Sequence, residues 1–203
     1  MTNINYKLTK VQENLLNIEN LREVKEINNI CASLEIPVKY TTDEILFSLN
    51  IMLRKIDHLR IEVLSNKEQY IRSYQEFNNI LIKKFESVSE LDSFIEVWKK
   101  DSIFDFKKPL HEFLIAEING VKKQLLIKFH HLISDIQFIT QFSNTFVGLL
   151  LNDINIEDVS GSYSQRTILN QEETIEFWEK ELESFEGENL YKENSKNLGT
   201  EVI

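Results

Sequence analysis

The sequence predicts an α+β fold, in which a mixed β-sheet is flanked by helices. Segments that alternate apolar and polar residues, as strands do, follow helical segments in irregular order along the chain. The dipeptide Asn119-Gly120 between two apolar runs is a strong hairpin signal. The 42% of hydrophobic residues is enough for a core, and only 5 Gly and 2 Pro exclude collagen-like and Pro-rich architectures.

The first half of the chain predicts two helices and several strands. Thr9–Asn17 is predicted as a short helix capped by Thr9, and Asn29–Ile36 alternates as a half-buried strand does. Thr41–Ile56 is predicted as a longer helix, because Thr41 and Glu44 have capping-box spacing before an apolar stripe. Further strands are predicted over Arg60–Leu64, Glu68–Tyr74 and Asn79–Phe85.

The second half predicts helices on either side of a hairpin. A helix follows a cap at Ser87 or Ser89. Glu112–Ile118 and Val121–Phe129 then form a hairpin, because both residues of its turn tolerate positive φ. The elements expected after it are the helix Gln137–Leu151, a linker over Asp153–Asn170 and a last helix capped by Asn170 and Glu173.

The charge balance and the single cysteine narrow the class of protein. The 23 Lys and Arg against 33 Asp and Glu give a net charge of −10, which argues against a nucleic-acid or anionic-membrane surface. Cys31 cannot form an intrachain disulfide, so a reducing compartment is expected. No apolar run approaches the roughly 20 residues of a membrane span, and the N-terminus lacks the pattern of a secretion signal. We therefore expect a soluble, cytoplasmic protein.

The segment Phe129–Asp135 (FHHLISD) carries the densest functional signal, because it lies where a predicted strand ends and a helix is about to begin. Histidine exchanges a proton near neutral pH, and a nearby carboxylate can orient its ring. The alternative is that His130 and His131 point to opposite faces and have no catalytic role. No metal site is expected, because His58 and His111 do not stand at ligand spacing from the pair.

HHLISD, residues 130–135, resembles the HHxxxDG signature of nonribosomal peptide synthetase condensation domains and of the wider chloramphenicol-acetyltransferase-like acyltransferases, with Ile136 in place of Gly. Four other segments resemble family motifs, in family order, so that the matches span about residues 6–185. They are LTKVQENLL at residues 8–16 (S/T-x-x-Q), KIDHLRIEV at residues 55–63 (RHExLRTxF), Phe104-Asp105-Phe106 with Pro109-Leu110 (FDL…PLxR), and Phe177-Trp178 with Leu182 (YWxxxL).

The resemblance implies a domain organisation. Members of the family are roughly twice as long and form a V-shaped pair of acyltransferase-like halves, with the active site in a tunnel between them. Residues 1–155 would then form the N-terminal acyltransferase-like subdomain, and residues 156–203 the linker and crossover helix toward a C-terminal subdomain. The chain would be an excised subdomain, a truncated product or a stand-alone half.

The resemblance also assigns the site residues. His131 would be the catalytic residue, which positions or deprotonates the attacking amine or stabilises the tetrahedral intermediate, and His130 would support it. Asp135 would form a structural salt bridge with Arg60 and hold the motif in place. Ile136 would stand at a substrate-access position, where a β-branched side chain could obstruct the substrate.

The implied function is amide formation in nonribosomal peptide and antibiotic biosynthesis. A carrier-bound acyl or aminoacyl thioester would be joined to an amine. No metal and no directly bound cofactor would be needed, since the substrates are attached to phosphopantetheine arms of carrier proteins. The expected partners are a carrier (thiolation) protein and a complementary C-terminal condensation subdomain, and an exposed apolar face would favour self-association. The isolated chain is expected to be inactive, because half a tunnel cannot hold both reactants.

Two alternatives remain open. The chain could be a degenerate, non-catalytic module of the same fold that serves carrier-protein docking or assembly. It could also be another acyltransferase of the superfamily, with an alcohol acceptor or a coenzyme-A donor.

Overall fold

The structure is a computed structural model that describes residues 5–21, 26–101, 104–161, 175 and 177–180. The chain divides into two compact units, residues 1–165 and residues 166–203. In the second unit, Ile175 and residues 177–180 are helical, as the sequence predicts, whereas the predicted caps of this helix lie outside the described residues. The paragraphs below describe the first unit.

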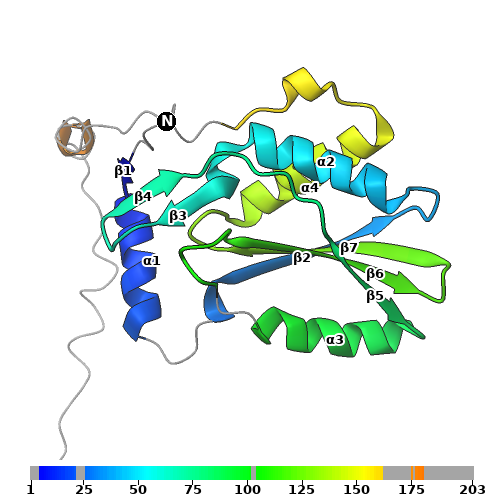
Figure 1. The fold of residues 1–203 in the computed structure, drawn as a ribbon. Helices are drawn as coiled ribbons and strands as arrows, with labels where there is room; N and C mark the ends of the chain where they lie inside the picture. The colour runs from blue at the N-terminus through cyan, green and yellow to red at the C-terminus, as the bar shows by residue number, and fades with distance from the viewer. Residues whose placement is uncertain (1–4, 22–25, 102–103, 162–174, 176, 181–203) are drawn as a thin grey trace, which may run out of the picture. The chain divides into compact units, whose positions relative to one another are not determined.

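A four-stranded mixed sheet forms the centre of the first unit, with the strand order β2-β7-β6-β5 (Figure 1). β7 (Lys122–His130) pairs antiparallel with both β2 (Asn29–Ile36) and β6 (His111–Ile118). β5 (Leu81–Phe85) lies at the edge and runs parallel to β6. The predicted α+β class with a mixed sheet is therefore confirmed.

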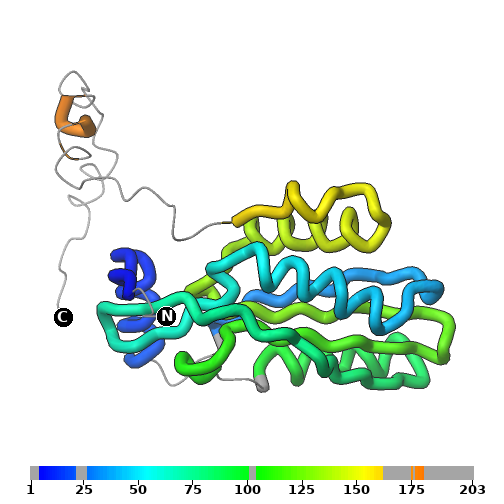
Figure 2. The backbone as a smooth tube through the Cα atoms, turned by 45° about the horizontal axis from the view of Figure 1, so that its top comes forward, coloured from blue at the N-terminus to red at the C-terminus, as the bar shows by residue number. Residues whose placement is uncertain are grey.

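Helices cover both faces of this sheet, α2 and α4 on one side and α3 on the other (Figures 1 and 2). The two-residue period of β7 sends alternate side chains to the two layers. Ile127 and Phe129 pack in the core beneath α2 and α4, whereas Leu126 packs beneath α3. The helix bounds are Thr42–Lys55 for α2, Val88–Asp101 for α3 and Ile136–Leu151 for α4.

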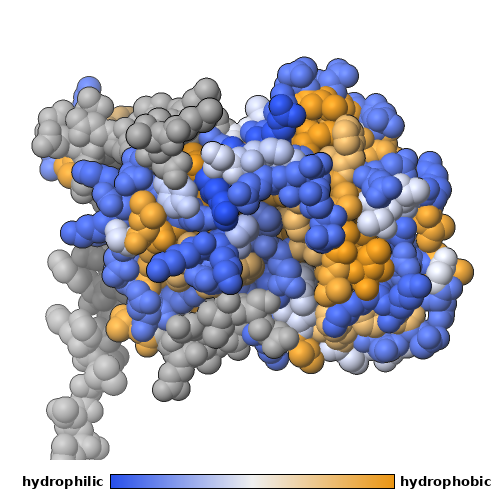
Figure 3. All heavy atoms as spheres, viewed as in Figure 1, coloured by the Kyte–Doolittle hydropathy of each residue, from blue (hydrophilic) through white to orange (hydrophobic). Residues whose placement is uncertain are grey.

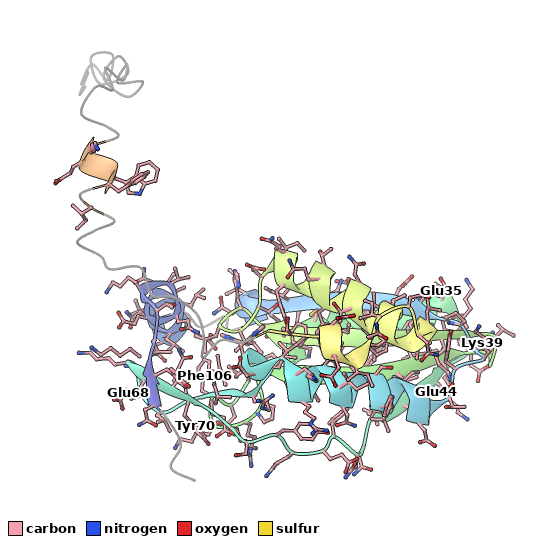
Figure 4. All side chains as sticks on the ribbon, turned by 90° about the horizontal axis from the view of Figure 1, so that it is seen from above. Glu35, Lys39, Glu44, Glu68, Tyr70 and Phe106 are labelled. Atoms are coloured by element: carbon pink, nitrogen blue, oxygen red, sulfur yellow. The ribbon has the colours of Figure 1, made fainter. Side chains whose placement is uncertain are left out.

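A second, three-stranded antiparallel sheet has the order β1-β4-β3. Its strands and the helix next to it are β1 (Asn5–Lys7), β3 (Ile61–Val63), β4 (Glu68–Ile71) and α1 (Lys10–Leu21). Figure 4 shows Tyr70 and Phe106 at this end of the unit, and Glu35 and Glu44 at the opposite end. Three short 3₁₀ turns complete the described elements: η1 (Glu26–Asn28), η2 (Asp57–Arg60) and η3 (Ile156–Asp158).

The predicted caps and turns form with the expected geometry. The side chain of Thr41 accepts a hydrogen bond from the Glu44 amide at 3.2 Å, and the Glu44 carboxylate accepts from the Thr41 amide at 2.7 Å. Of the two candidate caps for α3, Ser87 is the one that accepts, from the Glu90 amide at 3.2 Å. Asn119 and Gly120 adopt the positive φ angles, 50° and 66°, that their hairpin turn requires.

Three of the predicted strands are longer than the observed ones, most of all the strand predicted over residues 68–74. β4 ends at Ile71 rather than Tyr74, and the chain then continues outside both sheets to β5. Asn50 of α2 fixes this segment, because its Oδ1 accepts hydrogen bonds from the Tyr74 hydroxyl at 2.9 Å and from the Phe77 amide at 2.8 Å. The Arg72 amide still donates to the Arg60 carbonyl at 2.9 Å, and beyond it the Asn50 side chain, 24 to 27 residues distant, takes the place of a strand partner.

A buried charged cluster lies between the sheet and α3. Lys128 of β7 is fully buried, and its Nζ lies 3.1 Å from the Glu112 carboxylate of β6 and 2.7 Å from the carbonyl of Trp98, which accepts from it. The ammonium also lies 4.2 Å from the centre of the Trp98 ring, whose Nε1 donates to Glu112 at 2.8 Å. The cluster ties the last turn of α3 to two strands.

The visible surface is mostly hydrophilic with separate apolar patches (Figure 3). Exposed apolar side chains belong to several different elements; examples are Val11 of α1, Phe47 of α2, Leu81 of β5, Val97 of α3 and Ile136 of α4. In the part of the chain that the structure describes, no helix is both long enough and apolar enough to span a bilayer.

Candidate functional site

The two adjacent histidines lie at the end of β7, in the turn that leads to α4. The backbone of this turn is tied to its neighbours on both sides: the His130 amide donates to the Leu110 carbonyl at 3.0 Å, and the His131 amide donates to the Asn28 carbonyl at 2.7 Å. Leu132 is 4% exposed and thereby anchors the turn in the core. These contacts fix the backbone positions from which the two imidazole side chains extend.

His130 points into the protein and is 1% exposed. Its Nδ1 accepts a hydrogen bond from the Leu132 amide at 3.0 Å, and its Nε2 lies 2.7 Å from a carboxylate oxygen of Glu19 on α1. Because an amide N–H can only donate, Nδ1 carries the lone pair and Nε2 carries the proton. The edges of Phe104 and Phe106 meet this ring, with centroids 5.9 and 5.2 Å away.

His131 points outward and is exposed. Its Nδ1 lies 2.7 Å from the carbonyl oxygen of Ser134, and because a carbonyl can only accept, Nδ1 carries the proton. In the neutral ring, Nε2 therefore carries the lone pair, and it has no hydrogen-bond partner among the described residues. The two histidines thus have opposite tautomers, and the exposed one presents a basic nitrogen toward the surface.

Arg60 and Asp135, both within the described residues, do not form the predicted ion pair. Asp135 is instead the N-cap of α4, where its carboxylate accepts from the Phe138 amide at 2.7 Å. The Arg60 guanidinium donates to the carbonyls of Leu53, Arg54 at 3.0 Å and Arg72 at 3.0 Å. The prediction was wrong because each partner satisfies a helix end close to it in sequence: Asp135 caps the first turn of α4, and Arg60 binds the last carbonyls of α2.

The segment of residues 55–63 reaches α4 through a different side chain. The rings of His58 and Phe138 meet edge to face, with centroids 4.5 Å apart. Burial lowers the pKa of His58, and the nearby carboxylates of Asp57 and Asp135 oppose that shift. A neutral imidazole against an aromatic ring, rather than an ion pair, thus joins this segment to the first turn of α4.

Two residues that contact the turn are missing from the predicted site. Gln12, from the S/T-x-x-Q match, donates to the Leu132 carbonyl at 3.2 Å, and its Oε1 accepts from the Thr9 amide at 2.9 Å. The motif match was a signal for Gln12. Glu19, the partner of His130, lies beyond that match on α1, and nothing local marks it as buried.

Ile136 is the first residue of α4 and is 76% exposed. Of the described residues, only Asn119, Gly120 and Asn152 have positive φ, so the backbone at Ile136 does not require glycine.

Cys31 does not add a second reactive group to the site. Burial raises the pKa of the Cys31 thiol, which disfavours the nucleophilic thiolate. Among the described residues, no three His, Cys, Asp or Glu side chains gather closely enough to hold a metal ion.

A cavity of about 160 Å³ lies at the start of β6 and is lined by Arg60, Glu62, Arg72 and His111, among other residues. His111 pairs in register with Phe129, one residue before the histidine pair. Burial lowers the pKa of His111 from 6.5 to about 4. The ring is therefore neutral in the folded protein at pH values where it is charged in the unfolded chain.

We expect His111 to make the fold sensitive to acid. Between pH 6.5 and about 4 the unfolded chain binds a proton that the folded chain does not, so the free energy of unfolding falls as the pH falls. The loss is at most about 3.5 kcal/mol, since the pKa falls by about 2.5 units and one unit corresponds to roughly 1.4 kcal/mol. Urea unfolding of the wild type and His111→Phe at several pH values in this range measures it, and parallel pH dependences would contradict the prediction. His58 contributes in the same direction and is present in both proteins.

Comparisons with known proteins show a family whose model matches this sequence and solved structures with a similar fold. The family model for the condensation domain matches residues 3–197. The structure is similar to a double mutant of the starter condensation domain of the rhizomide synthetase RzmA (TM-score 0.69, 10% identity, 88% of this chain and 48% of that chain). It is also similar to the tallysomycin biosynthesis protein TlmII (TM-score 0.66, 9% identity, 89% of this chain and 48% of that chain).

A further similar structure is a four-domain nonribosomal peptide synthetase bound to AMP and glycine (TM-score 0.61, 18% identity, 92% of this chain and 14% of that chain). No curated protein matches the sequence. At these identities the structural likeness shows the fold alone. The chain spans about half the length of the first two structures, 48% of each.

Proposed function

This chain belongs to the condensation domain family, and from that premise we propose that it is the N-terminal portion of a unit that joins a carrier-bound acyl or aminoacyl thioester to an amine. The observation that carries the proposal is the geometry of His131. Its Nδ1–H donates to the Ser134 carbonyl, so the basic Nε2 is left available at an exposed position. A fixed imidazole with a free lone pair suits proton transfer near neutral pH.

The proposed reaction transfers the acyl group from the thioester sulfur to the amine nitrogen. The amine nitrogen attacks the thioester carbonyl carbon and gives a tetrahedral intermediate, while Nε2 of His131 accepts a proton from that nitrogen. The intermediate then collapses, the carbon–sulfur bond breaks, and the thiolate of the carrier arm leaves and takes up the proton. The products are an amide and a free thiol.

The partners of this reaction are part of the proposal. The substrates would arrive on phosphopantetheine arms of carrier proteins, and a complementary C-terminal subdomain would close the other side of the tunnel. Residues 1–155 would form the acyltransferase-like half, and residues 156–203 would lead toward the second half. The family match and the coverage of about half of the related structures support this arrangement.

One observation favours the second candidate, a non-catalytic docking or assembly module. Ile136, the exposed first residue of α4, follows the histidine turn in sequence and stands where the family signature has glycine. Its branched side chain would narrow the approach of a phosphopantetheine arm to His131. The two candidates differ in one respect only, which is whether the completed unit turns over.

The test supplies carrier-bound donor and acceptor thioesters to the purified chain, alone and together with a complementary C-terminal half. We expect amide product only with the added half, because one half cannot hold both reactants in attack geometry. Ile136→Gly is expected to raise that rate, and Gln137→Gly is the matched control at the neighbouring exposed position. Turnover by the chain alone would contradict the need for a second half. No turnover by any combination, Ile136→Gly included, would favour the non-catalytic module.

A further inference from the structure

A buried carboxylate lies behind the histidine pair. Glu19 of α1 is 3% exposed, and its Oε2 lies 2.7 Å from Nε2 of His130 and 2.8 Å from Nδ2 of Asn28. Burying a carboxylate is costly unless hydrogen bonds compensate it, and here the His130 ring and the Asn28 amide supply them. The connection joins α1 to the end of β7 across 111 residues of sequence.

Asn28 links the same carboxylate to the other histidine. Its side-chain amide donates to Glu19, whereas its backbone carbonyl accepts from the His131 amide at 2.7 Å. Both histidines are therefore connected to the Glu19–Asn28 pair, His130 through its ring and His131 through its backbone.

We propose that Glu19 is a positioning residue for His131. As an acceptor for Nε2–H, Glu19 keeps the proton of His130 on that nitrogen and leaves Nδ1 free to accept from the Leu132 amide. That bond closes the turn on one side, and the bond from His131 Nδ1 to the Ser134 carbonyl closes it on the other. The tautomer of the buried ring thus sets the backbone path that holds the exposed ring.

The proposal needs an acceptor at position 19 rather than a charge. If Glu19 and His130 formed an ion pair instead, His130 would carry protons on both nitrogens. Its Nδ1–H would then face the Leu132 N–H, two donors 3.0 Å apart. The two arrangements therefore differ in a proton that can be observed directly.

The experiment records long-range ¹⁵N–¹H spectra of the imidazoles in the full chain, which has only 4 histidines. We expect His130 in the Nε2–H form and His131 in the Nδ1–H form in the wild type. Glu19→Gln should keep both, because one amide oxygen can accept from Nε2–H and from Asn28. Glu19→Leu should lose the fixed tautomer of His130 and alter the His131 signals. Glu13→Leu, on the same helix but paired with Lys10 near the surface, should change neither ring.

The role of Glu19 as a positioning residue rests on the proposed function, and a second measurement tests that part. In the completed unit, Glu19→Leu should lower kcat by up to roughly 100-fold with little change in KM, because misplacing a reactive group by about 1 Å can cost that much. Glu19→Gln should retain activity within about threefold of wild type.

The outcomes of the two measurements are separable. A wild-type spectrum with His130 doubly protonated or protonated on Nδ1, or unchanged histidine spectra in Glu19→Leu, would overturn the inference. If Glu19→Leu does not fold, the wild-type and Glu19→Gln spectra still decide it. An inactive wild-type unit would defeat the proposed function, while the tautomers would still test the connection from Glu19 to the turn.

Discussion

Replacing His131 with alanine in the completed unit is expected to lower the rate of amide formation by roughly 100- to 10,000-fold, the range that a positioned general base supplies. The structure gives the reason, because the ring is held by the Ser134 carbonyl with its basic nitrogen outward. Steady-state rates with carrier-bound substrates measure the effect. A loss of stability of only about 1 kcal/mol should accompany it, since the exposed ring contributes one hydrogen bond, to the Ser134 carbonyl.

A matched control and a second variant sharpen this test. Gln137→Ala changes an exposed residue close to the turn and should leave the rate within about twofold of wild type. His130→Ala should reduce both rate and stability, because it removes the buried ring that binds Glu19 and accepts from the Leu132 amide. Equal rates for the wild type and His131→Ala would assign the proton transfer to another group.

The second large effect is expected in stability, at the cluster beneath α3. Glu112→Ala removes the carboxylate beside the fully buried ammonium of Lys128. We expect a loss of about 2–3 kcal/mol, less than for a fully buried pair, because the Glu112 side chain is 36% exposed and Lys128 keeps the Trp98 carbonyl. Glu117→Ala is the matched control on the same strand. Its partner Lys123 lies 3.8 Å away and also donates to the Tyr40 carbonyl at 2.9 Å, so we expect a loss below about 1 kcal/mol.

A double substitution separates the charge from the packing. If the cost comes from the ammonium that has lost its carboxylate, Glu112→Leu with Lys128→Met should recover most of the lost stability, since apolar pairs commonly replace buried ion pairs without loss. Chemical denaturation at one pH measures all four proteins. A double variant as unstable as Glu112→Ala would show that the packing of these side chains, rather than the charge, dominates.

The sequence predicts the elements well where the signal is local. Thr41 and Glu44 are three residues apart, and their mutual hydrogen bonds depend on little else. The turn at Asn119 and Gly120 is decided by the backbone freedom of those two residues, and it sets the register of β6 against β7. β2 follows directly from its alternation and has the predicted bounds, Asn29–Ile36.

The sequence predicts contacts between distant segments less well. A lysine within a strand usually indicates a solvent face, yet Lys128 is fully buried because Glu112 and the end of α3 surround it. Asp135 and Arg60 carry opposite charges, but each is satisfied by backbone groups nearby. Charge and spacing cannot show which of several partners a side chain will take.

The position of β2 in the sheet has a consequence for the order in which the chain folds. β6 and β7 are neighbours in sequence, so their hairpin closes a short loop. β2 pairs with the same strand across a far longer loop, with Asn29 opposite His130 and Ile36 opposite Lys123. Contacts between distant residues form slowly, because the entropy of closing the loop is lost before the contacts compensate it.

During synthesis on the ribosome, β2 is made before β7. Its backbone therefore cannot pair with residues 123–130 until these have been synthesised. The carbonyl of Asn28, next to β2, cannot receive the His131 amide before that docking. The histidine turn is therefore completed in the same late event that closes the sheet. A chain stalled before β7 would expose an unpaired strand, which is a risk for aggregation and a reason for chaperone binding.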